Sequence, residues 1–97
     1  LAALGLGVED LQEVNPRLVV ISISDFGQTG PYRDWTGTNW TQMAAAGVLS
    51  RSGIPGRAPV QPPGELAIEA TAVQAAYAAL LAYYHRLNTG TGEYVAA

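Results

Sequence analysis

The feature of this sequence that most constrains its fold is an apolar stretch that runs directly into a glycine-rich loop. Residues 17–24 are mostly β-branched and apolar, which is typical of a strand buried on both sides of a sheet. The next residues, 25–32, read DFGQTGPY. Gly27 and Gly30 permit positive φ and close backbone approach, and Pro31 fixes the direction in which the loop leaves. Ligand-binding loops of α/β enzymes follow such strands, so the sequence predicts a candidate binding loop here.

The other elements are predicted from hydrophobic periodicity, caps and breakers. They are a helix at 8–14, a strand at 17–24, a loop at 25–37, a helix at 38–49, an irregular connection at 50–64, a helix at 65–87 and a strand at 93–97. Asn15-Pro16 ends the first helix, and Thr38 or Asn39 is the N-cap of the second. A helix followed closely by a doubly buried strand indicates a parallel sheet of the βαβ type.

The helix at 65–87 is the longest predicted element and measures roughly 35 Å. Eight alanines between 67 and 82 give the other faces of the helix small side chains, so we expect it to be buried on several sides. Its uncharged run, 70–84, has 15 residues, whereas a membrane span needs roughly 20. We therefore expect the buried helix of a soluble protein and no membrane contact. Its apolar stripe consists of Leu66, Val73, Tyr77, Leu80, Tyr84 and Leu87.

Composition excludes several function classes. Eight acidic residues face five basic ones, all Arg and all scattered, so no basic stripe indicates a nucleic-acid partner. The sequence has no Cys and one His, which excludes disulfides, a Cys nucleophile and a zinc cluster within it. Such usage is compatible with the cytoplasm, and we expect no metal.

The chain lacks an initiator Met, and we expect residues 1–97 to be an internal fragment of a larger domain. With one clear strand, the isolated fragment is expected to fold poorly as a monomer, because small isolated sheets are marginally stable.

Several residues could carry chemistry. Glu65 and Glu69 share a helix face at i and i+4, near the end that favours anions. One interpretation is that both are solvated helix residues. The other is that Glu69 is a carboxylate nucleophile. His85 stands near a helix C-terminus, which favours a structural role. Trp35 and Trp40 flank a loop–helix junction, where a core position is favoured over a pocket wall.

Four motifs, in order and spacing, resemble the family III CoA-transferases. They are NPRLV at 15–19, FGQTGPY at 26–32, YHR at 84–86 and TGTGEYV at 89–95. That family includes formyl-CoA transferase, carnitine CoA-transferase and α-methylacyl-CoA racemase. The likeness covers roughly residues 11–95 and so nearly the whole chain.

The resemblance implies an α/β fold: a fragment of the Rossmann-like domain of such an enzyme, with a buried strand and a long Ala-rich helix. It also implies two interlocked subunits, hence a homodimer or a tandem-module partner. Family members attack an acyl-CoA thioester with an aspartate and pass CoA to a second carboxylate, which is covalent catalysis. Coenzyme A would thus be a substrate, carboxylic acids its acyl partners, and no cofactor tightly bound.

The resemblance also implies binding residues. Those expected to line the acyl or CoA pocket are Phe26, Gly27, Gln28, Gly30 and Tyr32. Thr38 and Asn39 follow Gly37 where relatives often have Gly-Tyr-Asp, a position that approaches the thioester and acyl group. An Asn at this position removes a carboxylate.

The nucleophile departs from the family pattern. Counting back from Thr89-Gly90, the family aspartate falls at Ile68, with Glu69 beside it and no Asp after Asp34. A one-residue step on a helix rotates a side chain by about 100°.

Three functions stay open. Glu69 is the acyl acceptor of a CoA-transferase, or the module is catalytically degenerate and serves as scaffold or dimer surface in a tandem protein. The racemase branch is a third function, and it needs an acid–base pair that the sequence alone does not assemble.

Overall fold

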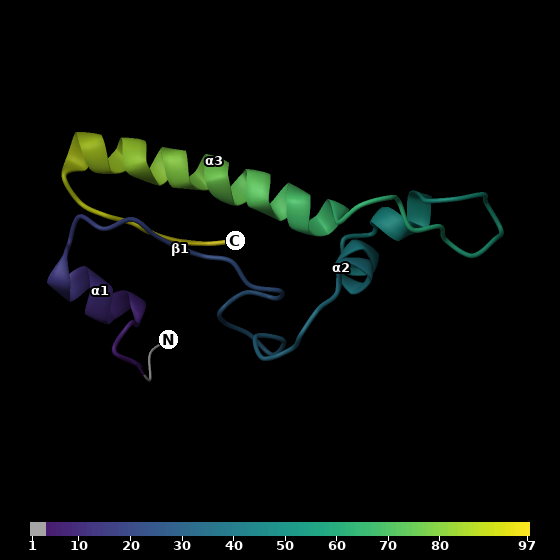
Figure 1. Ribbon diagram of the computed structural model, residues 1–97, viewed down its shortest axis with the longest axis horizontal. Coiled ribbons are helices and arrows are strands. Elements are labelled where there is room, and N and C mark those ends of the chain that lie inside the picture. The colour runs from purple at the N-terminus through teal and green to yellow at the C-terminus, as the bar shows by residue number, and fades with distance from the viewer. Residues whose placement is uncertain (1–3) are drawn as a thin grey trace. The chain divides into compact units, whose positions relative to one another are not determined.

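The computed structural model describes residues 4–97, and its elements are helices and two short strands (Figure 1). They are α1 (Val8–Val14), β1 (Val20–Ser22), α2 (Asn39–Ala45), the 3₁₀ helix η2 (Val48–Arg51), α3 (Leu66–Thr89) and β2 (Tyr94–Ala96). The predicted mixture of helix and strand is confirmed, and α1 has the predicted bounds. The chain forms two compact units: one from its two ends, up to Ser24 and from Gln74, and one from Asp25–Val73.

In the unit formed by the chain ends, β1 and β2 pair as parallel strands (Figure 1). The register places Val20 beside Tyr94 and Ser22 beside Ala96. The parallel pairing was expected, but burial of β1 on both sides is wrong. Its three residues are only half-buried, and Ile23 after them is exposed. The reason is that the sheet of the described residues has two strands, which leaves its faces largely open.

A tight backbone approach fixes the path from α3 into β2. The Gly92 N–H donates to the Pro16 carbonyl at 2.8 Å, just before the strand register begins. A Cβ built at position 92 would overlap the Leu18 carbonyl. Because the obstacle is backbone, no side-chain movement could relieve it, and only glycine fits. The second glycine of the TGTG motif therefore has a packing role.

The unit Asp25–Val73 contains α2 and η2. Thr38 is the N-cap of α2, as predicted, and its Oγ1 accepts from the Thr41 N–H. The helix ends at Ala45 rather than at 49. The cause is Gly47, whose φ of 74° is left-handed and interrupts the α-helix before η2 begins. Met43, 1% exposed, and Leu49 form the buried apolar residues here.

Burial of α3 is the reverse of the prediction. The buried residues of α3 are Ala75 and Ala82, which lie seven positions apart on one face. Small side chains allow that face to pack closely, whereas the predicted apolar stripe is 41–71% exposed. By length and composition alone α3 could cross a bilayer, with 11% of its most apolar window buried. The absence of a membrane partner stays a prediction.

Candidate active site

The predicted binding loop is closed at its neck by side-chain hydrogen bonds. The Asp25 carboxylate accepts from the Gly37 N–H at 2.8 Å. The Gln42 side chain donates through Nε2 to the Asp25 carbonyl at 2.9 Å. A Cβ at Gly37 would stand 2.6 Å from that Nε2 atom, so the glycine makes room for the amide. These three residues hold the two ends of the loop together.

Aromatic side chains form a small cluster inside this loop. Phe26 meets Tyr32 and Trp35 edge-on, with ring centroids 6.3 and 6.1 Å apart. Tyr32 and Trp35 are closer, at 4.5 Å, and such contacts stabilise aromatic pairs by about 0.5–1.5 kcal/mol each. Trp35 is nevertheless 60% exposed, and Trp40 is also exposed. The core position predicted for the tryptophans is therefore wrong, and the ring contacts of Trp35 are with Phe26 and Tyr32 of its own loop.

The loop glycines have the backbone conformation that the sequence predicts. Gly27 and Gly30 have φ of 84° and 93°. The Trp35 N–H donates to the Tyr32 carbonyl at 2.9 Å and tightens the turn that follows. The structure thus brings Phe26 and Tyr32 together and places Gly27, Gln28 and Gly30 in the same loop. Their contact with a ligand stays a prediction.

Thr38 and Asn39 have structural partners. Thr38 caps α2, and Asn39 is buried, with 7% of its surface exposed. The Asn39 carboxamide accepts from the Ala67 N–H at 2.8 Å and donates to the Gly64 carbonyl at 3.3 Å. Their contact with the acyl group also stays a prediction, and Asn39 in this structure is directed at the start of α3.

The family resemblance places the family aspartate in the first turn of α3, at Ile68. Ile68 there is 59% exposed, and Glu69 is exposed as well. The Glu69 Oε1 atom lies 3.5 Å from where a Gly64 Cβ would stand, so its carboxylate folds back over that glycine. A helix N-terminus favours a carboxylate electrostatically. The predicted site residues therefore form two groups, the loop with its aromatic cluster and the first turn of α3, both within Asp25–Val73.

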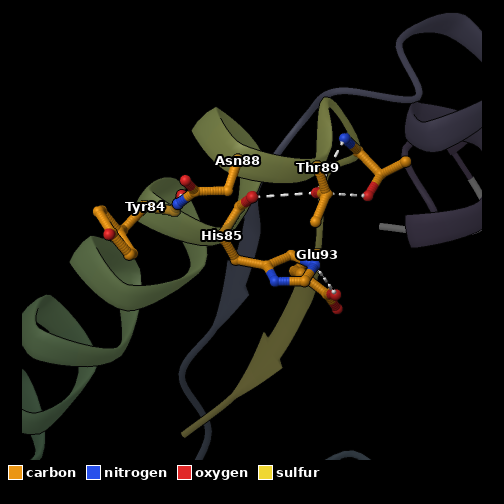
Figure 2. Close-up of polar contacts among 6 residues, drawn as sticks. Tyr84, His85, Asn88, Thr89 and Glu93 are labelled. Carbon is orange, nitrogen blue, oxygen red and sulfur yellow. Dashed lines mark hydrogen bonds and ion pairs between the residues drawn. The ribbon is translucent and has the colours of Figure 1, made fainter.

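A second polar group lies where α3 passes into β2. His85 pairs with Glu93 (Figure 2), and its Nε2 atom lies 3.2 Å from the Glu93 carboxylate. Thr89 donates through its hydroxyl to the His85 carbonyl at 3.0 Å, and Asn88 to the Tyr84 carbonyl at 2.8 Å. The structure thus supplies His85 with a carboxylate that sequence reasoning missed. Both side chains are about half exposed, which is typical of a surface pair that ties β2 to α3.

An open hollow of about 530 Å³ lies beside η2. Arg51 lines it together with Ser50 and Ser52. Both serine hydroxyls already donate to backbone carbonyls, those of Gly47 and Val60. Since no predicted site residue lines the hollow, it does not belong to the candidate site. Among the described residues, no three His, Cys, Asp or Glu side chains gather as metal ligands.

Sequence reasoning missed Asp25 and Gln42 at the neck of the loop, and the partners of Asn39. These contacts join residues 12–28 positions apart. A side-chain bond over that separation leaves no periodic signal in a single sequence. The Asp25 position directly before a glycine-rich turn was the one available sign, because Asp commonly accepts backbone hydrogen bonds in turns.

Known proteins resemble this chain along its whole length. A family model described as CoA-transferase family III matches residues 1–97. The chain is 45% identical over 94 residues to "Probable CoA-transferase Rv1866" of Mycobacterium tuberculosis, covering 97% of this chain and 12% of that protein. It is 39% identical over 94 residues to the "Succinyl-CoA--L-malate CoA-transferase beta subunit" of Chloroflexus aurantiacus, covering 96% and 23%.

The fold agrees with a solved structure. The crystal structure of a CAIB/BAIF family protein from Brucella suis matches with a TM-score of 0.91 and 31% identity, over 97% of this chain and 25% of that one. The chain thus spans a quarter or less of the length of these relatives. The family match across all 97 residues, the two sequence relatives and this fold lead to one conclusion: the chain belongs to CoA-transferase family III.

Proposed function

We propose that this chain forms part of an enzyme that moves CoA between carboxylic acids, with Glu69 as the acyl acceptor. The family match supports the reaction class. One observation supports Glu69 as the acceptor: its carboxylate is exposed on the first turn of α3, next to the expected position of the family aspartate. From the name of the Chloroflexus relative we infer succinyl-CoA as a donor and a small dicarboxylic acid as an acceptor.

The chemistry is a series of acyl transfers on one carboxylate. The Glu69 carboxylate attacks the thioester carbonyl, the C–S bond breaks, and CoA leaves as a thiolate. The product is a mixed anhydride of Glu69 and the donor acid. The thiolate then attacks the glutamyl carbonyl and releases the donor acid, which leaves CoA bound to Glu69. The acceptor carboxylate attacks that thioester, the C–S bond breaks, and CoA leaves again as a thiolate, so that a second anhydride forms between Glu69 and the acceptor. Attack of the CoA thiolate on the acceptor carbonyl yields the new acyl-CoA and regenerates Glu69.

Trapping with hydroxylamine tests the acceptor. The full-length protein is mixed with succinyl-CoA and hydroxylamine, and its peptides are mapped by mass spectrometry. An activated carboxylate becomes a hydroxamate at its own position. We expect the label on Glu69, its loss in Glu69→Gln, and its persistence in Glu65→Gln, which removes the carboxylate one turn earlier. A protein that turns over without any label at Glu69 contradicts the assignment.

A second function has its own support. The same 94 aligned residues cover 12% of the Mycobacterium relative and 23% of the Chloroflexus relative, so the former is about twice as long. That length suits a tandem protein in which one module has lost its nucleophile. Ile68, which cannot attack a thioester, suits it too. In that case this module serves as scaffold or dimer surface, and trapping labels only a carboxylate outside residues 1–97.

Assembly and location belong to the same proposal. The family resemblance favours an interlocked dimer or a tandem-module partner, with CoA as substrate and no tightly bound cofactor. The absence of Cys is compatible with a cytoplasmic location. The name of the Chloroflexus relative, a beta subunit, is in line with an enzyme of more than one chain. Light scattering of the full-length protein tests the dimer, and a monomeric mass contradicts it.

A further inference from the structure

The side chain of Asn39 bridges two parts of the unit Asp25–Val73. Its Oδ1 atom accepts from the Ala67 N–H at 2.8 Å, and its Nδ2 atom donates to the Gly64 carbonyl at 3.3 Å. Ala67 belongs to the first turn of α3, and Gly64 stands two positions before that helix begins. One carboxamide on α2 therefore forms hydrogen bonds to the backbone on both sides of residues 65–66, and these two bonds form a grip on the segment 64–67.

This grip requires both halves of an amide. The Ala67 N–H is among the first four of the helix, which have no partner within the helix, and Oδ1 supplies one. The Gly64 carbonyl needs a donor, which Nδ2 supplies and a carboxylate cannot. Asn39 is buried, so loss of either bond leaves a polar group poorly satisfied, which is costly away from water. Burial also restricts the carboxamide to this position.

The gripped segment carries Glu69. The Glu69 Oε1 atom lies 3.5 Å from the place of a Gly64 Cβ, so the carboxylate rests over one of the two residues that Asn39 holds. We infer that Asn39 is a positioning residue, which fixes the turn between Gly64 and Ala67 and thereby the direction of the Glu69 carboxylate. This inference rests on the proposed role of Glu69 as acyl acceptor.

Two variants separate the bonds. Asn39→Asp keeps the acceptor for Ala67 and loses the donor to Gly64, whereas Asn39→Ala loses both. In the full-length protein with succinyl-CoA, we expect kcat to fall about 10-fold for Asn39→Asp and about 100-fold for Asn39→Ala, because small misplacements of reacting groups have effects of that size. The KM for succinyl-CoA should stay within about twofold, because both polar atoms of the Asn39 carboxamide bond to backbone groups, and a larger rise would assign Asn39 to substrate binding instead. The yield of Glu69 hydroxamate should fall in parallel with kcat.

Met43→Ala is the matched control, because Met43 is a buried residue of α2 whose loss destabilises the same unit without touching the Asn39 bonds. Each variant is assayed at the same number of degrees below its own melting temperature, which removes the effect of stability alone. An equal fall in kcat for Met43→Ala would show that Asn39 is merely structural.

The failures are distinguishable. A wild-type protein without label at Glu69 overturns the proposed acceptor and, with it, the positioning role. A labelled wild type whose label and kcat are unchanged in both Asn39 variants overturns only the positioning role.

Discussion

The two ends of α3 are held in different ways. At its C-terminal end His85 pairs with Glu93 and Thr89 bonds within its own turn, while the backbone of Gly92 packs on the backbone of Leu18. At its N-terminal end a single buried side chain, Asn39, bonds to the first turn of the helix. The first is a joint in which backbone meets backbone, and the second is a support supplied by one side chain.

The difference separates structure from chemistry along one helix. The C-terminal joint feeds the chain into β2 through a backbone approach that leaves no space for a side chain. The N-terminal support holds the backbone of the first turn while Ile68 and Glu69 stay exposed. A reacting group needs a fixed backbone and an open side chain, and the N-terminal end provides both for Glu69, the proposed acceptor.

The largest effect is expected from Gly92→Ala at the C-terminal joint. Its Cβ would meet the Leu18 backbone, so we expect a loss of at least about 3 kcal/mol in the free energy of unfolding. Gly90→Ala is the matched control: φ there is 79°, and nothing lies within 4 Å of the new Cβ. The left-handed conformation alone costs about 1–2 kcal/mol. Urea unfolding of the full-length protein measures both, and equal losses would refute the packing role of Gly92.

The next effect compares one residue type at the two ends. Asn39 and Asn88 each donate to a backbone carbonyl, but Asn39 is buried and Asn88 is exposed. Asn39→Ala should cost about 2 kcal/mol because it removes two part-buried hydrogen bonds. Asn88→Ala should change stability by no more than about 0.5 kcal/mol, since water replaces its partner. Similar values for the two variants would mean that the N-terminal support is no stronger than a surface contact.

A smaller loss is expected at the cap that precedes Asn39. Thr38 accepts from the Thr41 N–H, and its own N–H donates to the Thr41 hydroxyl. Thr38→Ala should lower the free energy of unfolding by about 1 kcal/mol, and Thr38→Ser should restore most of it. Failure of the serine variant to do so would show that the threonine methyl, rather than the cap, stabilises α2.

The smallest effect is expected for the pair of His85 and Glu93. Both side chains are about half exposed, and such pairs contribute less than about 1 kcal/mol. A double-mutant cycle of His85→Gln and Glu93→Gln should give a small coupling energy, with kcat unchanged in every variant. A large fall in kcat would place chemistry at the C-terminal end and break the comparison.

Local signals in the sequence predicted local structure well. The bounds of α1 and the Thr38 cap follow from residues a few positions apart. The family motifs identified the chain, but they did not predict which atoms meet. The contact of Asn39 with the substrate stays a prediction, whereas its bonds to Gly64 and Ala67, partners 25 and 28 positions away, were not predicted. Periodicity predicted an apolar stripe on α3, yet the buried residues are Ala75 and Ala82. Which face of a helix is buried depends on the elements that pack against it, and periodicity does not identify those elements.

The register of β1 with β2 has a consequence for synthesis. Val20 pairs with Tyr94, 74 positions later. At a translation rate of about 5–20 residues per second, β1 leaves the ribosome roughly 4–15 s before its partner exists. During that interval the edge of β1 that β2 will cover is unpaired, and an unpaired strand edge is a template for association with other chains. In the finished molecule, the backbone of Gly92 leads the late strand to the early one.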